Sequence, residues 1–318
     1  MPYVSVITPC YNSARFVSYT IEGVRAQTFS DWEMIVVNNG STDDPISVVA
    51  PISSQDTRVS LLSKPHGGVA SARNTGFKAS SPDSKYVYFL DADDVPTPEM
   101  LQVMVEYLDD HPEVGLVFTA PLLIDEIGKE IGLARADSGW YPRQVPMGRF
   151  GMRFLRDDEP QTPLSSLFAL CTITPSVSVI RRSIYVQTPG WDEDFGQMYE
   201  DADLFMQIAL RSEVHWLPLR VVKYRRHSTQ TTTDLDRNIR QSIKLFQKWH
   251  ALMPQLEPTH RQMVAEAFRF RRGVVDVVTG WETGKRELKL GHLRPALGFM
   301  LGAARRRLAM LMYFQKVT

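Results

Sequence analysis

The sequence predicts an α/β fold with a mostly parallel central sheet flanked by helices. Strand and helix patterns alternate through residues 1–125, as they do in βαβ units. Within this region Tyr86–Leu90 is an uninterrupted apolar and aromatic run, typical of a strand that is buried on both faces of a parallel sheet. Three carboxylates, Asp91, Asp93 and Asp94, follow directly at the carboxyl end of that strand. Open α/β sheets bind their ligands at this edge.

The first part of the chain supplies the strands of this sheet. Apolar runs predict five strands, at Val4–Thr8, Trp32–Val37, Val59–Leu62, Tyr86–Leu90 and Val114–Phe118. A helix is predicted after Asn12 and Ser13, either of which can cap it. Further helices are predicted at Val69–Ala79 and Thr97–Asp110.

Helical spacing defines the apolar faces of two of these helices. The first helix places Val17, Ile21 and Val24 on one face. The helix at 97–110 likewise aligns Met100, Met104 and Leu108.

The remainder of the chain divides into an irregular part and a helical part. From Asp125 to Thr174 the periodicity weakens, and long segments of this kind inside a domain are often functional. A strand is predicted at Thr174–Ile180, a helix at Glu200–Leu210 and a strand at His215–Tyr224. Long helical patterns then cover Leu235–Leu252, Thr259–Val278 and Pro295–Phe314, so we place a boundary near residue 228.

Composition and charge exclude several classes of protein. With 43% hydrophobic and 23% charged residues, the 318-residue chain resembles ordinary globular proteins. Lys plus Arg and Asp plus Glu both number 36, so no overall positive field favours nucleic acid. Cys10 and Cys171 have no metal-type spacing. We see no signal peptide before Val4 and no membrane-spanning run of roughly 18 apolar residues. These features predict a cytoplasmic location.

The acidic segment after Leu90 has two interpretations. Asp-x-Asp spacing lets two carboxylates approach one hard cation, which can bridge the phosphates of a nucleotide. Alternatively, the segment is a solvated acidic turn that caps the helix after Pro96. The residues of this segment alone leave both interpretations open.

Three further motifs each follow a predicted strand. They are Thr8-Pro9-Cys10-Tyr11-Asn12, Val36-Val37-Asn38-Asn39-Gly40-Ser41-Thr42-Asp43-Asp44 and Gly67-Gly68-Val69-Ala70-Ser71-Ala72-Arg73-Asn74. The first can place backbone against a base or ribose, the second orders a turn, and the third allows close approach to a ligand. Each is also compatible with an ordinary connection when taken alone.

Taken together and in order, these four motifs resemble the inverting family-two glycosyltransferases of the GT-A fold. The resemblance covers residues 3–228 and continues through Gly190–Phe195, Tyr199–Leu204 and Tyr224–His227. It implies a Rossmann-like GT-A domain at 1–228, with a nucleotide-sugar-binding half at 1–125 and an acceptor-binding half at 126–228. Residues 229–318 would form a helical C-terminal region.

The resemblance assigns the donor site to the strand ends. Thr8, Pro9 and Tyr11 would line the nucleotide pocket, and Ser41 would contact the donor. Asn39 stands where the family usually has an aspartate that reads the base. Because an amide both donates and accepts, Asn39 could still bind a pyrimidine edge, but the change puts a uridine donor in doubt. Arg73 would stabilise the sugar–phosphate region.

The resemblance also implies a Mn²⁺ or Mg²⁺ site. Asp91 and Asp93 match the Asp-x-Asp motif, with Asp93 the more direct ligand, and Asp94 is less certain. His227 occupies the position of the family's phosphate- and metal-contacting segment. Its imidazole is a suitable Mn²⁺ ligand, although a lone histidine at a strand end is equally often structural.

Catalysis is assigned to the acidic start of the helix at 200–210. The resemblance makes Asp201 the base that deprotonates the acceptor hydroxyl, with Glu200 as a weaker candidate for acceptor contact. Acidic residues at a helix start also interact favourably with the helix dipole, so a purely structural role remains open. We place Asp203 on a solvated turn. Trp191 would form part of the acceptor wall or pack in the core.

These assignments predict a metal-dependent inverting glycosyltransferase. It would move a sugar from a nucleotide-diphospho-sugar to a hydroxyl of a glycan or lipid-linked acceptor, in cell-surface polysaccharide synthesis. The alternatives are a nucleotidyltransferase and, because of Asn38 and Asn39, a catalytically inactive nucleotide-sugar-binding protein.

The last segment, Gly291–Thr318, has five basic and no acidic residues among apolar ones. A helix of this composition can lie on an anionic membrane, which would place the protein peripherally on the inner face of the plasma membrane. Docking on the catalytic domain is the alternative.

Overall fold

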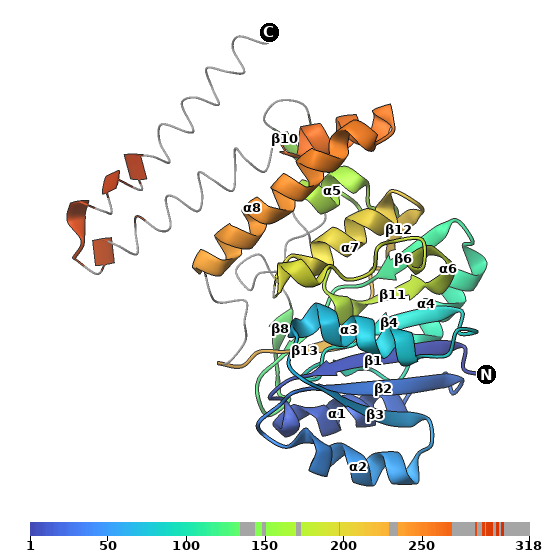
Figure 1. The fold of residues 1–318 in the computed structure, drawn as a ribbon. Helices are drawn as coiled ribbons and strands as arrows, with labels where there is room; N and C mark the ends of the chain where they lie inside the picture. The colour runs from blue at the N-terminus through green and yellow to red at the C-terminus, as the bar shows by residue number, and fades with distance from the viewer. Residues whose placement is uncertain are drawn as a thin grey trace. The chain divides into compact units, whose positions relative to one another are not determined.

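The structure is a computed structural model, and its ribbon is drawn in Figure 1. It describes residues 1–133, 144–147, 151–169, 173–196, 198–228 and 235–268, together with scattered positions between 284 and 301.

A seven-stranded, mostly parallel sheet forms the centre of the larger unit, as predicted. Its strands lie in the order β12 (Glu213–Trp216), β6 (Val114–Phe118), β11 (Ser178–Arg181), β4 (Tyr86–Phe89), β1 (Val4–Cys10), β2 (Trp32–Asn39) and β3 (Val59–Lys64). Only β11 runs antiparallel to its neighbours within the described sheet. The carboxyl ends of β1 to β4 therefore meet at one edge.

Helices cover both faces of this sheet because its strands are apolar on both sides. The helices of this unit are α1 (Ala14–Arg25), α2 (Pro45–Gln55), α3 (Gly68–Ala79), α4 (Met100–Asp110), α6 (Arg182–Tyr185), α7 (Glu200–Ala209) and α8 (Leu235–Leu252). In Figure 1, α3 lies on one face of the strands β1 to β3, and α1 and α2 lie on the other.

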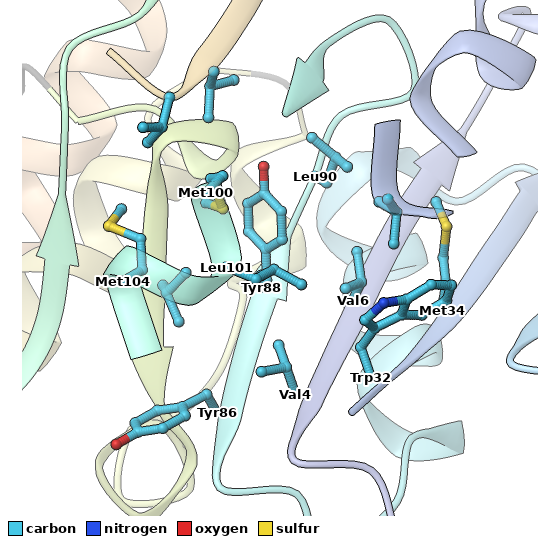
Figure 2. Packing of buried hydrophobic residues seen from close by; sticks show 14 of the residues in the cluster. Val4, Val6, Trp32, Met34, Tyr86, Tyr88, Leu90, Met100, Leu101 and Met104 are labelled. Carbon is cyan, nitrogen blue, oxygen red and sulfur yellow. The ribbon is translucent and has the colours of Figure 1, made fainter. Parts of the chain in front are cut away.

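Side-chain alternation along the strands separates the two layers of core. Val4 and Val6 pack in one cluster with the predicted apolar faces of α1 and α4, all of whose members are buried. Figure 2 shows this cluster, with Tyr88 of β4 beside Val6 and with Met100 of α4 nearby. On the other face, Ile35 and Val37 pack against Ala72 of α3.

A smaller sheet extends the strand-end edge. It contains β5 (Val95–Pro96), β13 (Val222–Arg225), β7 (Leu122–Ile124) and β8 (Glu130–Leu133), in that order. Since β5 directly follows the acidic segment and β13 precedes His227, this sheet brings the two ends of the predicted metal site together. A separate ribbon pairs β9 (Gln144–Met147) with β10 (Gly151–Phe154), and α5 covers Leu164–Ala169.

Two predictions of secondary structure were wrong in part, and one helix was missed. The single strand expected at His215–Tyr224 is two strands in different sheets, β12 and β13, separated by a segment that contains Pro218. Pro218 has no N–H to donate to a strand ladder, which favours a break in the strand at this point. The expected strand at Thr174–Ile180 begins as a 3-10 turn at Pro175–Val177. Helix α2 was not predicted.

The chain forms two compact units. The larger unit contains residues 1–142, 155–163 and 172–251, and therefore includes nearly all of α8. The smaller unit contains residues 143–154, 164–171 and 252–318. Within it the chain is helical at 258–268, where the helix expected at Thr259–Val278 begins; the rest of that helix, and most of the helix expected at Pro295–Phe314, lie outside the described residues.

No helix among the described residues is both long and apolar enough to cross a bilayer.

Candidate active site

Aromatic rings stand at the strand-end edge where the nucleotide pocket was predicted. Thr8 and Pro9 are buried at the end of β1, whereas the Tyr11 side chain is 42% exposed. The Tyr11 ring lies 4.2 Å from the His66 ring, centroid to centroid. The Nδ1–H group of His66 donates to the carbonyl of Asn39 at 3.1 Å. Tyr11 and His66 therefore form an aromatic surface beside β1, β2 and β3.

Ser41 joins the turns that follow β1 and β2. Its hydroxyl accepts from the Asn12 N–H at 3.1 Å and donates to the Cys10 carbonyl at 3.3 Å. Ser13 occupies the N-cap position of α1, but its side chain makes no cap. The Asp43 carboxylate instead accepts from the Ala14 N–H at 2.8 Å, so the β2 turn caps α1.

The prediction that Asn39 reads the base is corrected by the structure. Its side chain is 2% exposed, and both ends of its amide are occupied. Nδ2 donates to the Gly68 carbonyl at 3.0 Å, and Oδ1 accepts from the Gly67 N–H at 3.1 Å and from Lys64 Nζ at 3.3 Å. Asn39 therefore holds the glycine turn at the start of α3.

Asn38 also has a structural contact. Its Oδ1 accepts from the Ser41 N–H at 3.0 Å, which fixes the turn after β2. The hypothesis of an inactive protein depended on these two asparagines. Because both amides stabilise turns, their presence says nothing against catalysis.

A buried cation organises the centre of the site. Arg73 of α3 is 3% exposed and contacts two carboxylates, Asp91 at 2.8 Å and Glu200 at 3.0 Å. Its guanidinium also lies over the Trp191 ring, 4.2 Å from the centroid. Burial raises the pKa of Asp91, and the charge of Arg73 opposes that rise. Arg73 thus joins the end of β4 to the start of α7.

Asp201 is the second residue of α7 and adjoins this buried cluster. Its Oδ1 accepts from the Ala202 N–H at 2.7 Å. Burial, followed by the negative charge of Glu200, raises the pKa of Asp201 to about 7. Arg73 and Asp91 are close enough to act on the same pKa, in opposite directions. The structure therefore brings Asp91, Arg73, Glu200 and Asp201 into one electrostatic cluster.

Asp93 and His227 form a second pair at this edge. The His227 Nε2 and the Asp93 Oδ2 are 2.9 Å apart, and the imidazole packs on the Phe16 ring with a centroid distance of 5.0 Å. Asp94 is instead buried and structural, because its Oδ1 accepts from the Arg225 N–H at 3.0 Å. Burial raises the pKa of Asp94 well above its usual range.

The Asp93–His227 pair is compatible with a divalent ion. A carboxylate oxygen and an imidazole nitrogen suit Mn²⁺, and Mg²⁺ is often held by one or two protein carboxylates together with substrate phosphates. No group of three or more His, Cys, Asp or Glu side chains is arranged for a metal within the described residues. Asp91 contacts Arg73, so its role as a ligand stays a prediction.

The structure also places three other residues. Trp191 is 2% exposed and packs edge-on against Phe89, so of its two expected roles the structure shows core packing. Glu200 is buried against Arg73 and is not placed for acceptor contact. Asp203 is 1% exposed, whereas a solvated turn was expected.

The sequence interpretation assigned no role to several residues of the site. His66 adjoins the Gly67-Gly68 pair, and that position was a usable clue. Lys248 and Trp249 contact Asp203 from 45 and 46 positions away, and no local pattern indicates them.

Comparison with known proteins identifies the family. A family model described as Glycosyl transferase family 2 matches residues 5–185, more than half of the chain. The chain belongs to glycosyl transferase family 2. The match ends before α7, so Asp201 and His227 lie outside it.

Two sequence relatives carry the same type of name. An uncharacterized glycosyltransferase of Rickettsia bellii is 39% identical over 128 residues, which are 40% of this chain and 18% of that protein. Chondroitin synthase of Pasteurella multocida is 34% identical over 111 residues, which are 35% of this chain and 11% of that enzyme. The alignments therefore cover only a minor part of both relatives.

Solved structures support the GT-A fold. The mannosyltransferase PcManGT from Pyrobaculum calidifontis, in complex with GDP-Man and Mn²⁺, aligns with a TM-score of 0.64 and 19% identity, over 99% of this chain and 80% of that one. TarS 1–349 from S. aureus, in complex with UDP-GlcNAc, aligns with a TM-score of 0.56 and 15% identity, over 99% and 92%. At these identities the likeness shows the fold alone.

Proposed function

We propose that this chain is a metal-dependent inverting glycosyltransferase. It moves a sugar from a nucleoside-diphospho-sugar to the hydroxyl of a glycan or lipid-linked acceptor. The observation that carries the proposal is the cluster of Asp91, Arg73, Glu200 and Asp201, in which the pKa of Asp201 is about 7. A carboxylate with that pKa is matched to proton abstraction near neutral pH. Family membership favours glycosyl transfer over nucleotidyl transfer.

The donor site is proposed at the carboxyl ends of β1 to β4. Tyr11 and His66 present ring faces for a nucleobase. Asp93 and His227 would hold the divalent ion, which, when bound, supplies Lewis-acid neutralisation of charge on the departing diphosphate. Neighbouring structures with UDP-GlcNAc and with GDP-Man and Mn²⁺ support this assignment. They leave the base and sugar of this protein's donor open.

Asp201 acts as the general base in a single displacement. It takes the proton from the acceptor hydroxyl, whose oxygen bonds to the anomeric carbon as the bond to the diphosphate oxygen breaks on the opposite face. Arg73 holds Asp91 and Glu200 in place and provides fixed positive charge beside the base. The displacement needs no covalent intermediate with the enzyme, and we therefore assign no nucleophile.

The acceptor class is proposed from the sequence relatives. The chondroitin and hyaluronan synthases among the relatives favour a polysaccharide acceptor and a role in cell-surface polysaccharide synthesis. Membrane-surface contact through residues 291–318, and a cytoplasmic, peripheral location, remain proposals, because most of that segment lies outside the described residues. Flotation with anionic vesicles, before and after deletion of 291–318, tests the contact.

A thermal-shift panel tests the proposed donor class. The protein is heated with UDP-, GDP- and dTDP-sugars, each with and without Mn²⁺. We expect one nucleotide class to raise Tm, and the rise to depend on the ion. Stabilisation by nucleoside triphosphates with release of pyrophosphate would instead favour a nucleotidyltransferase. No shift with any nucleotide sugar would contradict the proposal.

A further inference from the structure

The buried carboxylate of Asp203 links α7 to α8. One oxygen of Asp203 accepts from the Trp249 indole N–H at 2.9 Å, and the other accepts from Lys248 Nζ at 2.7 Å. Trp249 is fully buried. Since a buried carboxylate is costly unless it is paired, these contacts fix the relative position of the two helices.

Lys248 makes a second contact, with the segment at residues 190–196. Its ammonium lies 2.6 Å from Asp192 Oδ2. Asp192 caps the short 3-10 turn at Glu193–Phe195 by accepting from the Asp194 N–H at 2.9 Å. Lys244, one helical turn earlier on α8, contacts the Asp194 carbonyl. One face of α8 therefore holds this segment as well as α7.

Both segments carry groups that belong to the active site. Asp201 lies on α7, two residues before Asp203. Trp191 directly precedes Asp192, and its ring supports the Arg73 guanidinium. A movement of α8 would consequently displace the proposed base and the platform beneath Arg73 together.

We propose that Lys248 and Trp249 are positioning residues of the active site, which hold Asp201 and Trp191 in place through Asp203 and Asp192. We call these three side-chain contacts, Lys248 with Asp192, Lys248 with Asp203 and Trp249 with Asp203, the α8 clamp. The proposal rests on the proposed function, since it names what positions the proposed base. It also makes α8, which lies beyond residue 228 and beyond the family match, part of the catalytic unit.

The direct test removes the two hydrogen-bond donors of the clamp, one in each variant. Lys248→Met keeps the aliphatic stem and deletes the ammonium, and Trp249→Phe deletes the indole N–H. Lys129→Met is the matched control, because Lys129 is exposed. Rates are measured as release of UDP from UDP-GlcNAc or of GDP from GDP-mannose, whichever the wild type turns over.

We expect both clamp variants to lower kcat by about 10- to 100-fold and to leave KM for the donor unchanged, because a misplaced base affects turnover more than donor binding. The acid limb of the pH profile should also move, since the proton affinity of Asp201 depends on its position beside Glu200 and Arg73. Lys129→Met should match the wild type in each measurement.

A second variant separates positioning from simple stability. Lys248→Met leaves Asp203 without its ammonium partner, and Lys248→Met/Asp203→Asn removes the unpaired charge. If the double variant recovers Tm while kcat stays low, positioning is supported. Recovery of kcat together with Tm would overturn the proposal, as would a Lys248→Met enzyme with wild-type kcat and pH profile.

Amide hydrogen exchange tests, independently of activity, whether the α8 clamp holds residues 190–206 in place. In Lys248→Met we expect faster amide exchange in residues 190–206 than in Lys129→Met, with the strands β1 to β4 unchanged. Equal exchange in the two variants would overturn the clamp. Absence of turnover in the wild type would count against the proposed function, while the exchange measurement would still decide the positioning proposal.

Discussion

At the scale of single residues, the proposed chemistry depends on the environment of Asp201. Burial and the adjacent charge of Glu200 favour its protonated form, and Arg73 favours its ionised form. Their balance places the pKa of Asp201 at about 7, about three pH units above the usual value for an aspartate. The carboxylate can therefore both accept and release a proton near neutral pH.

The pH dependence of turnover follows from this pKa. Protonated Asp201 cannot take a proton from the acceptor, so kcat/KM should fall tenfold for each pH unit below about 7. Above that pH the profile should level off. Initial rates from pH 5 to 9 measure it, and an acid limb centred near pH 4 would show that Asp201 titrates as an ordinary carboxylate.

The same pKa predicts that the fold loses stability as the pH rises, whereas turnover increases. Because the folded state binds this proton more tightly than the unfolded state, ionising Asp201 destabilises the fold. The penalty is absent below the ordinary pKa of 3.8 and complete above about 7. Asp201→Asn removes it, so we expect a gain on the order of 1–2 kcal/mol at pH 8, after allowance for partial exposure.

Urea unfolding of Asp201→Asn and wild type at pH 4 and pH 8 measures this gain. Equal differences in unfolding free energy at the two pH values would contradict the assigned pKa.

Arg73 should contribute far more to stability than an exposed arginine. Arg73→Met leaves Asp91 and Glu200 without their shared cation in a buried setting, which typically costs about 3–5 kcal/mol. Arg156→Met is the control, because the Arg156 side chain is 72% exposed beside Asp158 and its loss should cost less than about 1 kcal/mol. Comparable losses of unfolding free energy in the two variants would show that Arg73 is not a buried anchor.

At the scale of elements, the turn between β3 and α3 is held by a side chain of β2. Asn39 satisfies the Gly67 N–H and the Gly68 carbonyl at once, which only a group that both donates and accepts can do. Gly40 allows the turn after β3 to approach the end of β2 closely, since a Cβ at position 40 would stand 2.7 Å from the backbone nitrogen of His66. The aromatic surface of Tyr11 and His66 depends on this packing.

Asn39→Asp tests this assignment, because it restores the residue that the family resemblance leads one to expect. The carboxylate cannot donate to the Gly68 carbonyl, so we expect a loss of about 1–3 kcal/mol in unfolding stability. Nucleotide preference in the thermal-shift panel should not change. Unaltered stability with a gain of affinity for UDP-sugars would mean that position 39 reads the base.

Local patterns predicted most of the elements around the site. The strands at residues 4, 32, 59, 86 and 114 begin where apolar runs begin, and α8 spans the predicted residues. Burial on both faces makes such runs easy to recognise. One error arose because tertiary contacts determine where a strand ends: β13 pairs with β5 and β7 instead of continuing β12. The other was the missed helix α2, which contains Pro51, a residue that obscures a helical pattern.

Only the part of the site that belongs to sequence motifs could be predicted. Asp91 follows β4, Arg73 lies in the helix that begins at the glycine turn, and Asp201 lies in the first turn of α7, so each belongs to a recognisable motif. The roles of Asn39, Trp191 and Asp203 depend on partners far along the chain, and sequence position gave no indication that these side chains are buried. Because these side chains are buried, each has a structural role in place of the ligand-binding or solvated role expected from the sequence.

At the scale of the whole molecule, the larger unit combines a parallel sheet with strand ends from distant parts of the chain. The edge that holds Asp91 also receives His227 through β13 and Asp201 through α7. Residues 172–251 belong to this unit, so α8 extends it past the boundary near 228 that the change in composition indicated. The division of this unit into donor and acceptor halves remains a prediction.

The central claim is that Asp201 is the proton acceptor at this strand-end edge. The most direct measurement is the rate of nucleoside diphosphate release by Asp201→Asn, at pH 8 with Mn²⁺ and the donor found by thermal shift. We predict a kcat lower by about 10²- to 10⁴-fold, with the donor-dependent rise in Tm retained. A variant that binds the donor and turns it over at the wild-type rate would contradict the claim.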